Sequence, residues 1–149
     1  MNLSNLTKVV RFEIIDDGFI FYDEHDNIPN PKNAYWERDL LLYDYMGKSL
    51  KGLPKIVNGH LWIMRYTGES LEGLPDVVNG VLNLWHYDGA SLKGLPNAVH
   101  NYLDLSHYQG NDFDNLPKEY EKIYIKGNWY TKAEFDDYIK TEKLKKVLL

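Results

Sequence analysis

The chain contains no cysteine among its 149 residues. This absence excludes disulfide bonds, thiolate metal ligands and every mechanism that uses a cysteine nucleophile. It leaves the cellular compartment open, because a protein without thiols is compatible with oxidising and reducing surroundings alike.

The sequence also lacks a long apolar run and a basic stripe. A membrane-spanning helix needs about 20 consecutive apolar residues, and the first ten residues, MNLSNLTKVV, have no signal-peptide core. The net charge is -5 and the two signs are interspersed, so no surface is suited to a phosphate backbone. We therefore expect a cytoplasmic protein that binds neither membrane nor nucleic acid.

What the sequence does contain is a repeat. Leu-Pro recurs every 21 residues, at positions 53–54, 74–75, 95–96 and 116–117. The copies share the pattern x-L-x-L-x-x-Y-x-G-x-S-L-x-G-L-P-x-x-V-x-G and cover residues 39–59, 60–80, 81–101 and, one residue shorter, 102–121. A fixed period of this length means that one structural unit has been copied and stacked.

Each copy begins with two apolar residues separated by one variable residue, as in Leu61 and Ile63. Such alternation is typical of a half-buried strand. The residues that follow cannot extend the strand, because proline lacks an amide donor and glycine favours turns. We predict one short strand and a return segment per copy, with strands of stacked copies paired in parallel about 4.8 Å apart.

The segment SLEGLPDVVNG, residues 70–80, resembles the short leucine-rich repeats of bacterial and bacteriophage proteins, which read S-L-x-G-x-P-x-x-V-x-G before an apolar strand. The resemblance covers residues 39–121. It implies a repeat solenoid with a leucine-rich-repeat-like parallel β-sheet, irregular return segments and a concave strand face that holds another macromolecule. It also implies one specific form of this function, a phage-encoded inhibitor or adaptor of a host defence protein in the host cytoplasm.

Every copy departs from that family at the same two positions. A tyrosine replaces the usual asparagine, and a glycine replaces the usual leucine two residues later. The tyrosines are Tyr45, Tyr66, Tyr87 and Tyr108, and the glycines are Gly47, Gly68, Gly89 and Gly110. We interpret the pair as a volume exchange in which the ring fills the space of the missing leucine, because protein cores are close-packed. The alternative is an exposed tyrosine column that binds a ligand.

We expect a single solenoid domain over residues 1–149 with a cap at each end, since an open stack exposes its core and strand edges. Residues 1–38 are predicted to form a β-hairpin, whose second strand is the first rung of the sheet, and a degenerate repeat. The four repeats occupy 39–121. Residues 122–149 add a last strand and a capping α-helix that begins at a capping box, Thr131 to Glu134.

The variable positions of the predicted strands face away from the core, and most of them differ from copy to copy. Exposed tryptophan, tyrosine and arginine at the centre of a patch are the composition of an interaction hot spot. We therefore predict that this face recognises a protein partner. The predicted binding residues are Tyr43, Trp62, Met64, Arg65, Trp85, His86 and His107.

Two other uses of this face stay open. One is a carbohydrate-binding module that stacks sugars on Trp62 and Trp85, and the other is homodimerisation. His86 and His107 suggest metal binding or acid–base chemistry with Ser106, but a catalytic site needs an orienting set of hydrogen bonds and a pocket that excludes water. An open sheet offers neither, so we predict no catalytic, metal or cofactor site and no enzymatic activity.

Overall fold

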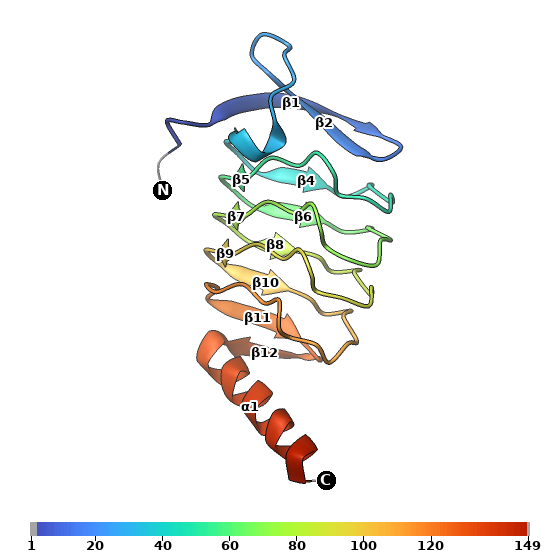
Figure 1. Ribbon diagram of the computed structural model, residues 1–149, viewed down its shortest axis with the longest axis vertical. Helices are drawn as coiled ribbons and strands as arrows, with labels where there is room; N and C mark the ends of the chain where they lie inside the picture. The colour runs from blue at the N-terminus through green and yellow to red at the C-terminus, as the bar shows by residue number, and fades with distance from the viewer. Residues whose placement is uncertain (1–2, 149) are drawn as a thin grey trace.

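The computed structural model describes residues 3–148, which form a β-solenoid. Its coils stack along one axis, with a β-hairpin at the N-terminal end and a helix at the C-terminal end (Figure 1). The solenoid predicted from the 21-residue period is confirmed. Among residues 3–148, no helix combines the length and apolarity needed to cross a bilayer.

One side of each coil is the predicted strand, and together these strands form what we call the main sheet. Its parallel strands are β4 (Leu40–Leu42), β6 (Leu61–Ile63), β8 (Leu82–Asn83), β10 (Tyr102–Asp104) and β11 (Lys122–Ile125), and β12 (Asn128–Thr131) is antiparallel at the edge. The register pairs Leu40 with Leu61 and Leu61 with Leu82. Equivalent leucines of successive copies therefore stack directly on one another.

The return segments were expected to be irregular, but they contain short strands that belong to a second sheet. Its strands are β5 (Ile56–Val57), β7 (Val77–Val78) and β9 (Ala98–Val99), which pair in parallel and continue through β3 (Ala34–Trp36) to β1 (Thr7–Ile15) and β2 (Gly18–Asp23). We call this the side sheet. A strand of two residues is too short to show alternation, so the sequence pattern did not reveal it.

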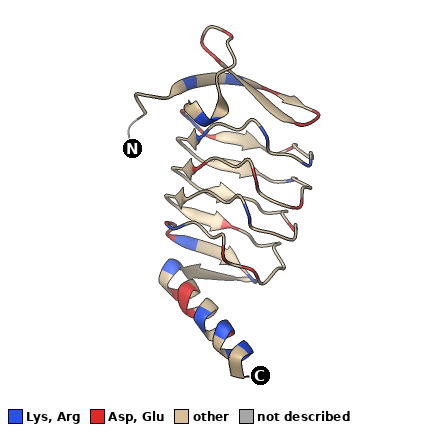
Figure 2. Ribbon diagram, in the orientation of Figure 1, with Lys and Arg blue, Asp and Glu red and all other residues tan. Residues whose placement is uncertain are grey.

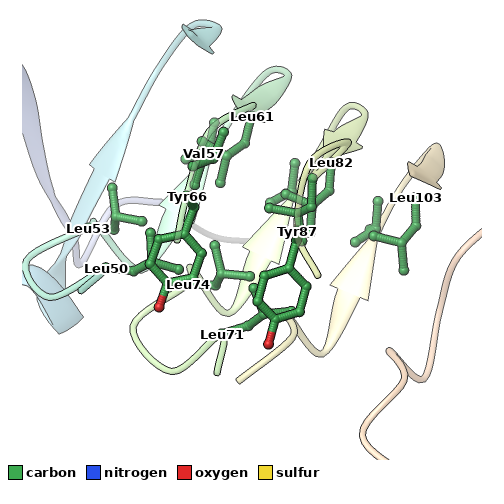
Figure 3. Packing of buried hydrophobic residues seen from close by; sticks show 14 of the residues in the cluster. Leu50, Leu53, Val57, Leu61, Tyr66, Leu71, Leu74, Leu82, Tyr87 and Leu103 are labelled. Carbon is green, nitrogen blue, oxygen red and sulfur yellow. The ribbon is translucent and has the colours of Figure 1, made fainter. Parts of the chain in front are cut away.

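The core lies between the two sheets and the return segments. Figure 3 shows Tyr66 and Tyr87 lying parallel in successive coils among leucines of the return segments. Their ring centroids are 6.0 Å apart with an interplanar angle of 14°. All four column tyrosines are buried, with at most 4% of their surface exposed. The alternative of an exposed tyrosine column is therefore wrong.

The tyrosine hydroxyls are satisfied inside the fold. Each hydroxyl donates to the backbone carbonyl four residues later, for example Tyr66 to Ser70 at 2.6 Å and Tyr108 to Asp112 at 3.0 Å. Burial raises the pKa of Tyr87 to about 12. A Cβ atom placed on Gly68 would overlap the hydroxyl of Tyr66, and the other three glycines meet their own tyrosines in the same way. The volume-exchange interpretation is confirmed.

The N-terminal hairpin forms as predicted, but its place in the fold differs. The strands β1 and β2 are antiparallel, and β1 pairs in parallel with β3. The prediction that the second strand is the first rung is wrong, because β4 is the edge of the main sheet and β2 the edge of the side sheet. The reason is burial: Phe12, Phe19 and Phe21 cover the open end by packing on Trp36 and Tyr45.

The C-terminal cap contains the predicted last strand, β11, and α1 (Lys132–Leu148). The capping box is confirmed: the Thr131 amide donates to Glu134 Oε1 at 2.8 Å, and the Glu134 amide donates to Thr131 Oγ1 at 3.2 Å. The hydrogen bond from the Thr131 amide to the Glu134 carboxylate holds the pKa of Glu134 below its ordinary value. Phe135 is fully buried between Phe113 and Tyr138, which fixes the first half of the helix on the last coil.

Candidate functional site

Of the predicted binding residues, Trp62 lies within a strand of the main sheet, and the others lie in the segments that follow the strand ends. Along β4, Leu40 and Leu42 are buried and Leu41 is exposed, as alternation requires. Tyr43 and Trp85 follow the ends of β4 and β8, and Trp62 is the central residue of β6. We call this surface the strand face, made of Leu41, Tyr43, Trp62, Met64, Arg65, Trp85, His86 and His107.

The aromatic side chains of the strand face form two groups. Tyr43 meets Trp62 edge to face, with ring centroids 5.7 Å apart. Trp85 contacts His86 at 4.0 Å and His107 at 5.1 Å between centroids, and the two imidazoles are 5.2 Å apart. Within residues 3–148, no ring contact joins Trp62 to Trp85. The site is therefore two neighbouring aromatic groups rather than one compact cluster.

The side chains of the strand face differ in how much of their surface is exposed to solvent. Tyr43 and Trp85 are 45% and 41% exposed, whereas Trp62 and Met64 are half-buried. The indole Nε1 of Trp62 is buried and has no acceptor in the described part of the chain. The rings that a partner reaches most easily are thus Tyr43 and Trp85, with Trp62 packed beneath Tyr43.

Arg65 supplies an unpaired positive charge beside these rings. Its guanidinium is exposed and makes no ion pair within residues 3–148. It lines a shallow depression together with Met46, Tyr66, Thr67, His86 and Asp88. A carboxylate brought by a partner would find this charge free to pair with it.

Side chains at two variable positions of the main sheet have a structural role, because they accept hydrogen bonds from the backbone. Asn83 Oδ1 accepts the Trp85 amide at 3.0 Å, and Asp104 Oδ1 accepts the Ser106 amide at 3.0 Å. These bonds turn the chain at the strand ends, as asparagine and aspartate commonly do. A ring nitrogen of His107, Nδ1, bonds the carbonyl of Trp85; since a carbonyl only accepts, Nδ1 carries the proton. The backbone at Trp85 is therefore held from both sides.

Within the described residues, His86 and His107 have no third metal-ligating side chain grouped with them. Among residues 3–148, no three His, Asp or Glu side chains gather in a group that could hold a metal ion. The hydroxyl of Ser106 is buried and has no hydrogen-bond partner in the described protein, so no imidazole is placed to take its proton.

A third aromatic group, which was not predicted from the sequence, lies at the C-terminal end of the main sheet. Trp129 on β12 is exposed and packs edge-on against Tyr102 and Tyr124, at 5.1 and 5.0 Å between centroids. Tyr124 is in register with Asp104 on one side and Trp129 on the other. The sequence feature that could have indicated this group is the glycine at 127, which favours a turn. In the structure Lys126 and Gly127 both have positive φ, and this turn returns the chain as β12, the sixth strand of the sheet.

Comparisons with family models, with curated proteins and with solved structures find no match to this chain. The resemblance to short leucine-rich repeats accordingly stays a prediction from the repeated residues.

Proposed function

We propose that the protein is a non-catalytic, leucine-rich-repeat-like binding module that recognises a protein partner through the strand face. One observation carries the proposal. Tyr43 and Trp85 remain about two-fifths exposed on coils that bury their other large rings. Exposed tyrosine and tryptophan beside an unpaired arginine match the composition of interface hot spots, so their exposure supports a role in contact.

The expected energetics suit a protein interface. An aromatic side chain buries about 150–250 Å² in full, so the exposed part of each ring is about 60–100 Å². At about 25 cal/mol per Å², burying each ring contributes roughly 1.5–2.5 kcal/mol. The contacts of Trp85 with His86 and His107 already restrict its ring, so little side-chain entropy is lost on binding.

The test compares the protein with a double variant, Tyr43→Ala/Trp85→Ala, in affinity capture from its native cell. A matched control is Tyr35→Ala, which removes a half-buried ring from the outward side of β3 in the side sheet. A captured protein is then purified and titrated by calorimetry. We expect the wild type and the control to bind it alike, and the double variant to lose at least about tenfold in affinity, or 1.4 kcal/mol.

Other results would redirect the proposal. Equal capture by all three proteins would show that the strand face is not the contact surface. Glycan binding that is lost in Trp85→Ala, without a protein partner, would favour the carbohydrate-binding alternative. A wild-type dimer that the double variant abolishes would favour homodimerisation through the strand face. The association with bacteriophage and host defence rests on the resemblance alone and is tested only by the identity of the captured partner.

A further inference from the structure

The C-terminal helix has two apolar faces on opposite sides. Its first half buries Phe135, with Tyr138 and Ile139 partly buried against the last coil. Its second half carries Leu144, Val147 and Leu148, which are 62%, 81% and 84% exposed. Residues three and four apart share a helix face, and the nine residues from Phe135 to Leu144 make about 2.5 turns. The second apolar face therefore points away from the solenoid.

The opposite end of the molecule also exposes aliphatic side chains. Ile14 and Ile15 lie at the tip of the β1–β2 hairpin, and Ile28 lies in the loop that follows β2. Figure 1 shows this hairpin and loop at one end of the long axis and the free end of α1 at the other. Of the eleven large apolar residues exposed in the described chain, these two ends hold six. At the hairpin end these side chains lie in two places, Ile14 and Ile15 at the tip and Ile28 beyond the far end of β2.

The two ends carry opposite charges. Residues 3–28 contain six acidic and two basic residues, a net charge of -4, whereas residues 140–148 contain four lysines and one glutamate, a net charge of +3. Figure 2 shows acidic residues at the hairpin tip and bands of lysine along the end of α1. Within residues 3–148, Asp16, Asp17, Lys140 and Lys143 take part in no ion pair. These charges are free to pair with another molecule.

We propose that copies of this chain associate head to tail, the hairpin end of one against the free end of α1 of the next. Opposite charge and exposed aliphatic side chains meet in this arrangement. Pairing of two helix ends would instead place lysines against lysines. Head-to-tail contact is heterologous, so it adds further copies rather than closing a dimer. It also leaves the strand face open, so it is independent of the proposed function.

The contact is expected to be weak and sensitive to salt. Three aliphatic side chains at each end provide much less than the ~800 Å² per partner of a standard stable interface. Charges at an exposed interface are screened within about 10 Å at 0.1 M salt. We expect association at about 100 µM protein in low salt, and at least about a tenfold loss at 0.5 M NaCl.

The test uses charge reversal at each end, with sedimentation equilibrium as the measurement. The first variant is Asp16→Lys/Asp17→Lys and the second is Lys140→Glu/Lys143→Glu. A control with the same net charge as the second variant is Lys48→Glu/Lys118→Glu, which changes exposed lysines away from both ends. Each protein is measured up to about 500 µM in low and high salt, alone and with the first two variants mixed.

We expect the wild type and the control to exceed the monomer mass of 17.5 kDa in low salt. Each end variant alone should associate at least about tenfold more weakly, because like charges then meet. The mixture should recover association, because every junction again joins opposite charges, and this recovery shows that both variants are folded.

Three results would overturn the proposal. The first is a wild type that stays monomeric at every concentration. The second is undiminished association of the Asp16→Lys/Asp17→Lys variant, which would indicate contact between two helix ends. The third is sedimentation of the monomeric wild type with phosphatidylserine vesicles that Lys140→Glu/Lys143→Glu abolishes, which would make an anionic membrane the occupant of the helix face.

Discussion

The pairing of Tyr87 with Gly89 permits a quantitative test of the core. Tyr87 is 1% exposed and its hydroxyl donates to the carbonyls of Glu69, at 2.9 Å, and Ser91. Replacing Tyr87 with alanine removes a buried ring, which costs about 3–5 kcal/mol of unfolding free energy. Replacing Gly89 with alanine places a methyl group against the tyrosine ring, 2.6 Å from Cε1 and Cζ, and such overpacking costs about 1–3 kcal/mol.

The informative quantity is the coupling between the two changes. In the Tyr87→Ala background the ring is gone, so the methyl group of Gly89→Ala enters open space and its cost falls to about zero. The double variant should therefore be more stable than additivity predicts by about 1–3 kcal/mol, within the range known for residues in contact. This sign follows directly from the volume exchange.

Urea unfolding followed by far-UV circular dichroism measures all four proteins of this cycle. Because Tyr87→Ala removes a large share of a typical stability of about 5–15 kcal/mol, Tyr87→Phe is a milder replacement that keeps the ring. In that background Gly89→Ala should stay costly, since Cε1 and Cζ remain. Penalties that add within about 0.5 kcal/mol in the alanine cycle would refute the reasoning.

Two further predictions concern backbone and pH. Gly73→Ala should lower the free energy of unfolding by more than about 2 kcal/mol, because Gly73 has φ +104 and its Cβ would lie 2.7 Å from the Leu50 carbonyl oxygen. The control Gly127→Ala, at φ +79 with nothing within 4 Å of the added Cβ, should lower it by about 1 kcal/mol. Equal losses of unfolding free energy in the two variants would contradict this prediction. Burial raises the pKa of Tyr87 to about 12, so the contribution of Tyr87 to stability should be constant below pH about 10, where the phenol is neutral in both states, and should be lost as pH rises from there through the folded value. Urea midpoints against pH, with tyrosinate absorbance, check this; a midpoint unchanged up to pH 12 would exclude it.

The sequence predicted the features that repeat. The strand positions, the register of 21 residues and the Tyr–Gly exchange recur in every copy, so several copies give the same evidence for each of these features. The buried tyrosines and stacked leucines bear out that reading. The capping box at Thr131 was predictable for another reason: its two hydrogen bonds are local and need only residues three positions apart.

Features that depend on tertiary packing, or that span only two residues, were not predictable. Three of the six strands of the side sheet, β5, β7 and β9, have only two residues and therefore no period to detect. The position of β2 depends on where Phe19 and Phe21 find an apolar surface, a tertiary choice that alternation along the chain does not contain. Likewise, the role of Asn83 in holding the Trp85 amide depends on the strand ending there, and variability alone suggested recognition instead.

Each tyrosine, its glycine and its Leu-Pro lie within one coil. This arrangement has a consequence for how the number of coils can change. Each coil supplies the side chains that fill its own part of the core, and its strand pairs with the neighbouring strands in one constant register. Gain or loss of a whole 21-residue unit would therefore leave both caps and all remaining coils intact. Each such event would change the length of the strand face by about 4.8 Å and add or remove one row of variable side chains. The extent of the contact surface is thus an evolvable quantity with a fixed step, independent of the residues displayed on it.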